Sequence, residues 1–313
     1  MPEYVVILII LTMFAILLIS GLYIHSILFA SGIIGLIFLE GFGILSGLLG
    51  NEPFNRAASY TLTTIPLFVL MAQFILQSGI VQDMFYMIHK ISRGKNSLLG
   101  ALTIIIGGLL GAVSGSGTAT AASLGQVAVP ELKKHGYKPE LAAAVAASGG
   151  SLSGIVPPSI ILILYGVATE TPVGDLFMAA VIPSILVMIS FILVMLVCYL
   201  SYKKRAKNIV HKEAQTEDIK LSPLRLIIAN GVGISIVVII FGGIYTGLFT
   251  PTEAGAVGAF TAFLAALFLG KVNLGFFNRA LTETIKVTGM VMLILIGAQI
   301  FEGLFLYLYC LES

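Results

Sequence analysis

Apolar stretches separated by short polar segments run along the whole chain. A stretch of ~20 apolar residues is long enough to cross a lipid bilayer as a helix. The pattern therefore predicts an all-α integral membrane protein that crosses the bilayer several times. Continuous helices are expected at residues 4–20, 25–50, 64–90, 176–201, 225–249, 253–270 and 281–308.

Residues 97–132 depart from this pattern, because they are apolar at both ends and carry a run of glycine, serine and threonine in the middle. Two crossings need ~40 apolar residues and a turn, which this segment does not provide. A single crossing would place one of the basic loops at residues 90–95 and 133–138 on the wrong side of the membrane. The segment is therefore predicted to be a re-entrant hairpin with arms at residues 97–113 and 119–132.

A broken helix is expected directly after the hairpin. It should begin near Glu140, loosen at Ser148-Gly-Gly-Ser-Leu-Ser-Gly154, resume after Pro157 and Pro158 and end near Ala168. Tandem prolines remove two amide donors and disfavour a helical residue before them, which frees carbonyl oxygens. Non-helical backbone at membrane depth survives where protein buries it or where it lines a watery cavity. Secondary transporters hold substrates and coupling ions at such breaks.

The basic residues predict how the helices are oriented. Lys and Arg gather in four segments, at residues 90–95, 133–138, 203–212 and 271–279. An even number of predicted crossings separates each successive pair, so all four are expected in the cytoplasm. Both termini and the turns at residues 169–175 and 250–253 then lie outside the cytoplasm. Residues 202–223 form a cytoplasmic linker.

Composition excludes several classes of protein. With 58% hydrophobic and 10% charged residues, the chain lies outside the range of soluble domains. Its net charge of +2 is carried by loops and gives no reason to expect nucleic acid as a partner. Cys198 and Cys310 lack metal or disulfide spacing, and no Ser/His/Asp or His/Glu constellation indicates an enzyme or a cofactor.

The hairpin tip and the helix break share small residues and hydroxyl groups. Such segments offer carbonyl and hydroxyl oxygens, which bind Na⁺ in several transporter folds. The same residues also suit a packing seam of the small-xxx-small type, in which glycines let helices approach closely. Both interpretations stay open at this point.

Elsewhere, Glu253 is expected to cap the helix that follows it, with Thr250 or Thr252 as the N-cap.

Several motifs, in order along nearly the whole chain, resemble the large membrane subunit of tripartite ATP-independent periplasmic (TRAP) transporters, the dicarboxylate-permease M type. They are Pro66-Leu-Phe-Val-Leu-Met71, Gln77-Ser-Gly-Ile80, Gly111-Ala-Val-Ser-Gly-Ser-Gly-Thr-Ala-Thr-Ala-Ala122, Gly136-Tyr137, Pro139-Glu-Leu-Ala-Ala-Ala144, Pro157-Pro-Ser159, Tyr165-Gly166 and Phe249-Thr-Pro-Thr-Glu-Ala254.

The resemblance implies an ion-transporter fold that works by an elevator motion, in the inner membrane of a bacterium. It implies Na⁺-coupled import of organic acids such as C4-dicarboxylates or sialic acid. The expected partners are a small four-helix membrane subunit and a periplasmic substrate-binding protein, with the lipid bilayer around them. Carried over by motif position, the ion- and substrate-binding candidates are Ser114, Gly115, Ser116, Gly117, Thr118, Gly150, Ser151, Ser153, Gly154, Pro157 and Pro158.

Two features of the sequence depart from the family pattern. Gly117 stands where the family usually has a second serine, and Gly149-Gly-Ser-Leu-Ser-Gly154 differs from the usual Ala-Gly-Thr-Ile-Gly-Pro. Family members also continue into a second hairpin and a second broken helix, so this chain is expected to be truncated at its C-terminus. A non-functional or split fragment of a permease, or a structural membrane subunit, is the alternative function.

A short internal repeat suggests how the chain is divided. Phe54-Asn-Arg-Ala57 recurs as Phe277-Asn-Arg-Ala280, each before a long helix and on opposite sides of the membrane, as inverted repeats require. The second repeat is expected to be incomplete. The predicted parts are scaffold helices at 1–96, transport elements at 97–168, a membrane helix at 169–201, a linker at 202–223 and the start of the second repeat at 224–313.

Overall fold

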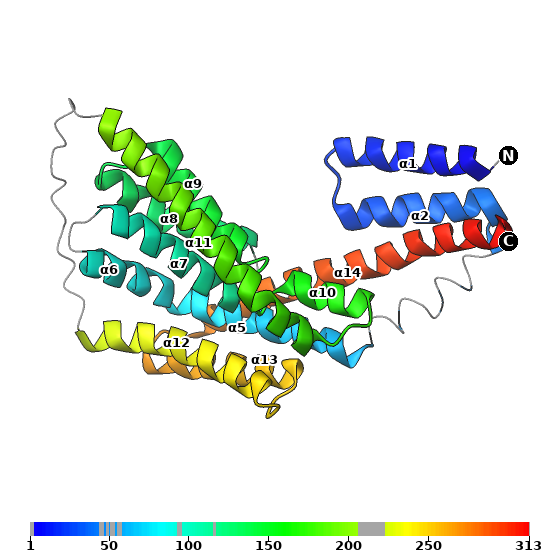
Figure 1. The fold of residues 1–313 in the computed structure, drawn as a ribbon. Coiled ribbons are helices and arrows are strands. Elements are labelled where there is room, and N and C mark those ends of the chain that lie inside the picture. Colours follow the sequence, from blue (N-terminus) through cyan, green and yellow to red (C-terminus); the bar gives the residue numbers. More distant parts are fainter. Residues whose placement is uncertain are drawn as a thin grey trace. The chain divides into compact units, whose positions relative to one another are not determined.

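The computed structural model describes residues 3–43, 47, 50, 54, 58–92, 96–114, 117–205 and 223–312 of the chain. All regular secondary structure in this part is helical, with no strand among the described residues, as the apolar pattern predicts. The chain divides into two compact units (Figure 1). One is Met1–Leu62 with Ile285–Ser313, and the other is Thr63–Thr284.

The described α-helices of the first unit include α1 (Glu3–Ile19), α2 (Ile24–Glu40) and the later part of α14 (Leu274–Glu312). Their core consists of Ile10, Leu36, Ile300 and Leu304. Gly32 lies so close to α14 that an added Cβ would be 2.9 Å from Ile300. Glycine at this position therefore permits the close helix contact that is common between membrane helices.

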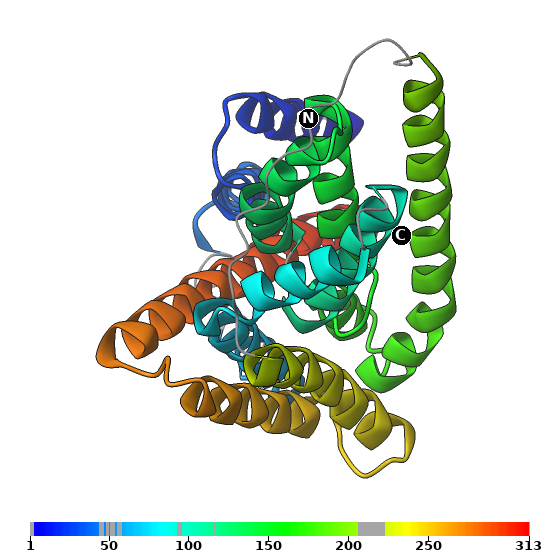
Figure 2. The same ribbon diagram turned by 90° about the vertical axis from the view of Figure 1, so that its left-hand side faces the viewer.

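The second unit contains the other helices, which include both predicted broken elements. They are α5 (Thr64–Ser78), α6 (Ile80–Ser92), α7 (Asn96–Ser114), α8 (Gly117–Lys134), α9 (Pro139–Leu152), α10 (Ile160–Ala168), α11 (Val173–Arg205), α12 (Pro223–Tyr245), α13 (Pro251–Phe268) and the start of α14. Helices α7, α8 and α9 pack against one another, and α11 packs along α7 and α9 (Figure 1). Helices α12 and α13 lie side by side (Figure 2).

Two helix predictions were wrong, and glycine is the reason in both. The helix expected at 25–50 ends at Glu40, where Gly41 adopts a φ of 75°. The helix expected at 64–90 is divided into α5 and α6 by Gly79, whose φ of 79° is left-handed. A positive φ ends an α-helix and is accessible to glycine without steric cost.

Four described segments are long and apolar enough to cross a membrane. They are Tyr60–Ser78, Val173–Tyr202, Pro251–Phe268 and Leu274–Phe305. Only 11% of the span in α11 is buried inside the protein, so most of this helix presents apolar side chains outward. These segments confirm the prediction of a multi-pass membrane protein.

The predicted cap of α13 is confirmed. Thr250 Oγ1 accepts a hydrogen bond from the Glu253 amide at 3.3 Å, and Glu253 Oε2 accepts one from the Thr250 amide at 2.8 Å. This reciprocal pair is a capping box. Thr252, the alternative N-cap, instead lies 2.6 Å from the Thr64 hydroxyl on α5, a contact that ties α5 to α13.

Several predicted features lie partly outside the described residues. Most of the predicted linker does so, as does most of the first Phe-Asn-Arg-Ala motif. The second copy, Phe277–Ala280, lies in α14. The inverted repeat therefore stays a prediction.

Candidate functional site

Helices α7 and α8 form a helical hairpin whose two outer ends meet. The Tyr137 hydroxyl donates a hydrogen bond to the Asn96 carbonyl at 2.7 Å, and Asn96 Nδ2 donates one to the His135 carbonyl at 2.7 Å. Asn96 begins α7, whereas His135 and Tyr137 follow the end of α8, so the arms are antiparallel. The hairpin topology is confirmed. Its depth in the membrane stays a prediction, because α7 with 19 residues is ~28 Å long, close to the thickness of the hydrocarbon core.

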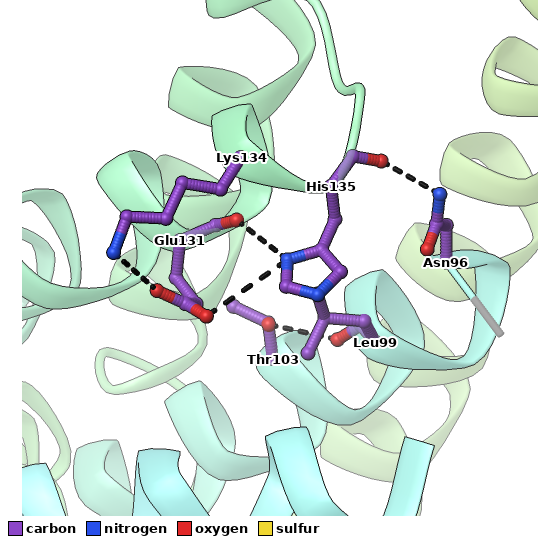
Figure 3. Close-up of polar contacts among 6 residues, drawn as sticks. All are labelled: Asn96, Leu99, Thr103, Glu131, Lys134 and His135. Atoms are coloured by element: carbon purple, nitrogen blue, oxygen red, sulfur yellow. Dashed lines mark hydrogen bonds and ion pairs between the residues drawn. The ribbon is translucent and has the colours of Figure 1, made fainter. Parts of the chain in front are cut away.

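Polar contacts surround the outer ends of the hairpin (Figure 3). Lys134 Nζ lies 3.3 Å from Glu131 Oε2, and His135 Nδ1 lies 3.0 Å from the Glu131 carbonyl oxygen. The ion pair is exposed on its lysine side, so it adds little stability. The more specific contact is the amide of Asn96 on the His135 carbonyl, which joins the start of α7 to the loop after α8.

Tyr137 connects the same region to α11. Its ring stacks on Tyr199 with the centroids 4.8 Å apart, and its side chain is buried. Burial first, and the neighbouring Tyr199 second, raise the pKa of the Tyr137 phenol above its ordinary value, although the backbone near Gly100 opposes this. The phenol is therefore a neutral donor over the whole physiological pH range.

The glycines on the hairpin arms serve close packing against α9. Gly107 faces Gly149 so closely that neither has room for a side chain directed at the other. One turn later, a Cβ on Gly111 would lie 2.5 Å from Ser153 Cα. On α9, a Cβ on Gly150 would lie 2.5 Å from Ala121 Cβ of the second arm, α8. This spacing of four residues is the small-xxx-small seam, so the packing interpretation is confirmed for the arms.

The helix break is shorter than predicted. Loosening at Ser148 was wrong, because α9 remains helical to Leu152, and the break occupies residues 153–159 before α10 begins at Ile160. Packing of Gly149 and Gly150 against the hairpin surrounds this part of α9 and offsets the low helix propensity of glycine. The prediction that the helix resumes after Pro157 and Pro158 is confirmed.

Hydroxyl groups replace two of the hydrogen bonds that the break removes. The Ser159 hydroxyl donates to the Gly154 carbonyl at 2.8 Å, and the Ser184 hydroxyl on α11 donates to the Ile155 carbonyl at 2.9 Å. Pro157 has no amide hydrogen, so the Ser153 carbonyl lacks the donor that a continuing helix would supply. No other donor in the described part of the chain reaches it. Sequence reasoning missed Ser184, because nothing near it in the chain marks a serine that bonds to a distant helix break.

The hairpin tip and the helix break meet in space. A Cβ on Gly117, at the start of α8, would lie 3.2 Å from Ser153 Oγ and 3.3 Å from the Gly150 carbonyl oxygen. The Ser153 hydroxyl is buried and donates to the same carbonyl at 2.8 Å. Gly117 of the hairpin thus lies against two uncharged oxygens at the end of α9, more than thirty residues away in the sequence.

The remaining candidates are placed unequally. Gly115 and Ser116 lie outside the described residues, and only the backbone of Ser114 and Thr118 is described. Three others, Gly150, Pro157 and Pro158, are buried, whereas Gly154 is partly buried. Ser151 is exposed, and its hydroxyl donates to the Ser148 carbonyl at 2.9 Å. The structure therefore joins Gly117, Gly150 and Ser153 and directs the Ser151 hydroxyl into its own helix.

The sequence matches the family model described as "Tripartite ATP-independent periplasmic transporter, DctM component" over residues 11–309. It is 32% identical over 254 residues to the C4-dicarboxylate TRAP transporter large permease protein DctM of Pseudomonas aeruginosa, covering 81% of this chain and 58% of that relative. It is 33% identical over 249 residues to the sialic acid TRAP transporter large permease protein SiaM of Vibrio cholerae, covering 78% and 55%. It is 30% identical over 248 residues to the 2,3-diketo-L-gulonate TRAP transporter large permease protein YiaN of Escherichia coli, covering 79% of this chain and 56% of that relative. The chain spans just over half the length of these relatives.

Proposed function

The chain belongs to the family of the DctM component of tripartite ATP-independent periplasmic transporters, and from this premise we propose that it binds the coupling ion of a Na⁺-driven importer of organic acids. It is a multi-pass protein of the bacterial inner membrane. The permease is the part of such a system that a solute must pass through. Its function therefore depends on a site where an ion and a carboxylate bind within the membrane.

One observation carries the proposal, the meeting of the hairpin tip with the helix break at Gly117 and Ser153. The break supplies a carbonyl at Ser153 without an amide partner, and glycines let the backbone of both elements approach closely. Uncharged carbonyl and hydroxyl oxygens at discontinuous helices are typical ligands for Na⁺ in transporters. A bound Na⁺ would in turn favour the negative charge of a carboxylate substrate beside it.

The proposed ligands come from both elements. The Ser153 hydroxyl and the Gly150 carbonyl are the described groups that lie nearest to Gly117. The Ser153 carbonyl, which has no amide partner among the described residues, belongs to the same helix break. The other residues that the family resemblance assigns to ion or substrate binding are Ser114, Gly115, Ser116, Thr118, Ser151, Gly154, Pro157 and Pro158. Relatives named for C4-dicarboxylate, sialic acid and diketogulonate permeases support an organic acid as the substrate.

We further propose an elevator motion in which the transport elements at residues 97–168 move against the scaffold helices. The hairpin and the broken helix are suited to this role, because they pack tightly on each other through glycines and would move together. The names of the relatives refer to a tripartite system. A small four-helix membrane subunit and a periplasmic binding protein are therefore the proposed partners.

The ion site is tested by amide hydrogen exchange on the purified chain in lipid nanodiscs. Exchange at residues 148–159 should slow in NaCl relative to choline chloride at equal ionic strength, because a bound ion stabilises the conformation that holds it. KCl should give much weaker protection. Equal exchange in all three salts would contradict the proposal.

The transport function is tested with a chimaera, because this chain matches just over half of the Pseudomonas aeruginosa relative. Residues 11–309 would replace the matched segment of that permease, which is then expressed with its own partner proteins. The expected result is Na⁺-dependent uptake of a radiolabelled C4-dicarboxylate. A chimaera that reaches the membrane in normal amounts but shows no uptake above the empty-vector control would contradict the proposal.

A further inference from the structure

Helix α11 contacts the hairpin and the helix break along a single stripe. Met195 Sδ would lie 2.9 Å from a Cβ on Gly100, and Met188 Cε would lie 2.5 Å from a Cβ on Gly108. One turn before Met188, the Ser184 hydroxyl reaches the break. The stripe repeats at helical spacing, and most other side chains of this span face outward.

Ser184 is the polar member of this stripe and is only 3% exposed. Its hydroxyl lies 2.9 Å from the Ile155 carbonyl oxygen and 2.6 Å from the Ala180 carbonyl oxygen of its own helix. A serine hydroxyl has one hydrogen to donate, so the two carbonyls share it. The bond to Ala180 is the usual contact of a serine within a helix, whereas the bond to Ile155 joins two helices.

The hydrogen bond from Ser184 on α11 means that one peptide group in the break is held at both its carbonyl and its amide. The Ile155 carbonyl accepts from Ser184, and the amide on the other side of that peptide bond, at Val156, donates to the Leu152 carbonyl at 2.8 Å. The preceding peptide group is held in the same way. There the Gly154 carbonyl accepts from Ser159, and the Ile155 amide donates to Leu152 at 3.0 Å.

The next peptide group towards the N-terminus differs. The Gly154 amide donates to the Ser151 carbonyl at 3.2 Å, but the Ser153 carbonyl of the same peptide group has no donor in the described part of the chain. Two fixed peptide groups thus adjoin a carbonyl that has no hydrogen-bond donor among the described residues. The Ser153–Gly154 peptide group is joined to these fixed groups at the Gly154 Cα, so holding them in place restricts the φ and ψ angles that can reorient the Ser153 carbonyl.

We propose that Ser184 is a positioning residue for the cation site, which it serves by fixing the Ile155 carbonyl and thereby the orientation of the Ser153 carbonyl. This inference rests on the proposed Na⁺ site but adds a residue from a helix that lies outside the hairpin and the break. Ser184 itself does not touch the ion. It acts through the backbone of the break.

The chain contains a matched control for this role. Ser190 lies on the same helix, and its hydroxyl donates to the Leu186 carbonyl at 2.9 Å, four residues earlier, as that of Ser184 does to Ala180. Ser190 is exposed and makes its bond within α11. Replacing Ser190 by alanine therefore removes the same type of intrahelical bond and leaves the break untouched.

The test compares the wild-type chain with Ser184→Ala, Ser184→Thr and Ser190→Ala in nanodiscs. The measured quantity is the NaCl concentration that gives half-maximal protection of residues 148–159 from hydrogen exchange. Ser184→Ala should raise this concentration about three- to tenfold, as expected for one interhelical hydrogen bond in a membrane protein. Ser190→Ala should leave it unchanged. Ser184→Thr keeps a hydroxyl on the same carbon and should restore most of the affinity.

A second readout uses no Na⁺. In choline chloride, the amides of residues 154–156 should exchange faster in Ser184→Ala than in Ser190→Ala. Equal Na⁺ dependence in the wild-type, Ser184→Ala and Ser190→Ala chains would overturn the role of Ser184 while leaving the ion site intact. A wild-type chain that ignores Na⁺ would overturn the ion site and this role together. In that case faster exchange in Ser184→Ala would identify Ser184 as a packing residue only.

Discussion

Gly117 and Ser153 lie against each other, so that a Cβ added to Gly117 would be 3.2 Å from Ser153 Oγ. Gly117 begins the second arm of the hairpin, and Ser153 is the first residue after α9. At 3.2 Å a methyl group is tolerated only if the neighbour moves by a few tenths of an ångström. The contact between hairpin tip and helix break is therefore sensitive to the size of residue 117.

This sensitivity gives the first prediction. Gly117→Val should push the hairpin tip away from Ser153 and raise the NaCl concentration for half-maximal protection by about fivefold or more, an effect of roughly 1–3 kcal/mol for overpacking at a buried contact. Gly125→Val on the same helix is the control, because a Cβ at Gly125 meets no atom within 4 Å. If both variants bind Na⁺ as the wild type does, the contact at Gly117 is not part of the site.

A second prediction concerns the packing seam and is measured as thermal stability. Gly150→Ala should lower the free energy of unfolding by about 1–3 kcal/mol, because its Cβ would meet the Ala121 backbone of α8 at 2.7–2.9 Å. Gly125→Ala should have the opposite sign, with a gain of up to about 1 kcal/mol, because alanine favours a helix more than glycine does. A Gly150→Ala chain as stable as Gly125→Ala would show that α8 and α9 are less tightly packed than the structure indicates.

The sequence was sufficient to predict the two broken elements, because their causes are local. Pro157 and Pro158 have no amide hydrogen to donate, so the helix before them cannot continue through them, whatever surrounds them. The hairpin likewise follows from a run of small residues between two basic loops. Its confirmed feature is the meeting of its outer ends at Asn96 and Tyr137.

What the sequence could not predict depends on contacts between distant segments. Gly149 and Gly150 remain helical because α7 and α8 pack on them, a tertiary effect that outweighs local propensity. Gly79 looks like any other glycine in an apolar run, yet its left-handed φ divides one predicted helix into two. The bond of Ser184 to Ile155 joins residues 29 positions apart and has no local signature.

The outer end of the hairpin provides a prediction about pH. The pKa of Tyr137 is raised by burial, whereas an unfolded tyrosine has a pKa of about 10. The protonated Tyr137 phenol therefore makes its full contribution to the free energy of unfolding below about pH 10. That contribution falls as pH rises further, because the phenol then loses its proton more readily in the unfolded chain than in the folded one. The unfolding temperature of the wild-type chain should thus decrease more steeply above about pH 10 than that of Tyr137→Phe.

Tyr137→Phe keeps the ring on Tyr199 and removes the hydrogen bond to the Asn96 carbonyl, so it should cost about 1 kcal/mol at neutral pH. Tyr23→Phe is the control, because Tyr23 is 75% exposed. The difference in unfolding temperature between wild type and Tyr137→Phe should shrink as pH rises from about 8 to about 11. A constant difference over this range would mean that Tyr137 titrates alike in the folded and unfolded chains.

The last prediction tests the orientation of the hairpin. Both of its outer ends adjoin basic loops, and the hydrogen bonds of Asn96 to His135 and Tyr137 hold those ends together. They must therefore lie on the same side of the membrane, and the excess of Lys and Arg places that side in the cytoplasm. In a chain whose native cysteines are replaced by serine, a cysteine at Lys95 or at Lys138 should react with a membrane-impermeant maleimide only after the cells are opened. A cysteine at Glu170, in the exposed turn between α10 and α11, should react in intact spheroplasts. Each cysteine variant is labelled again after solubilisation in detergent, which shows whether its thiol is reactive at all. Labelling of Lys95→Cys and Lys138→Cys from opposite sides would contradict the hairpin, and labelling of all three variants in intact spheroplasts would contradict the predicted orientation.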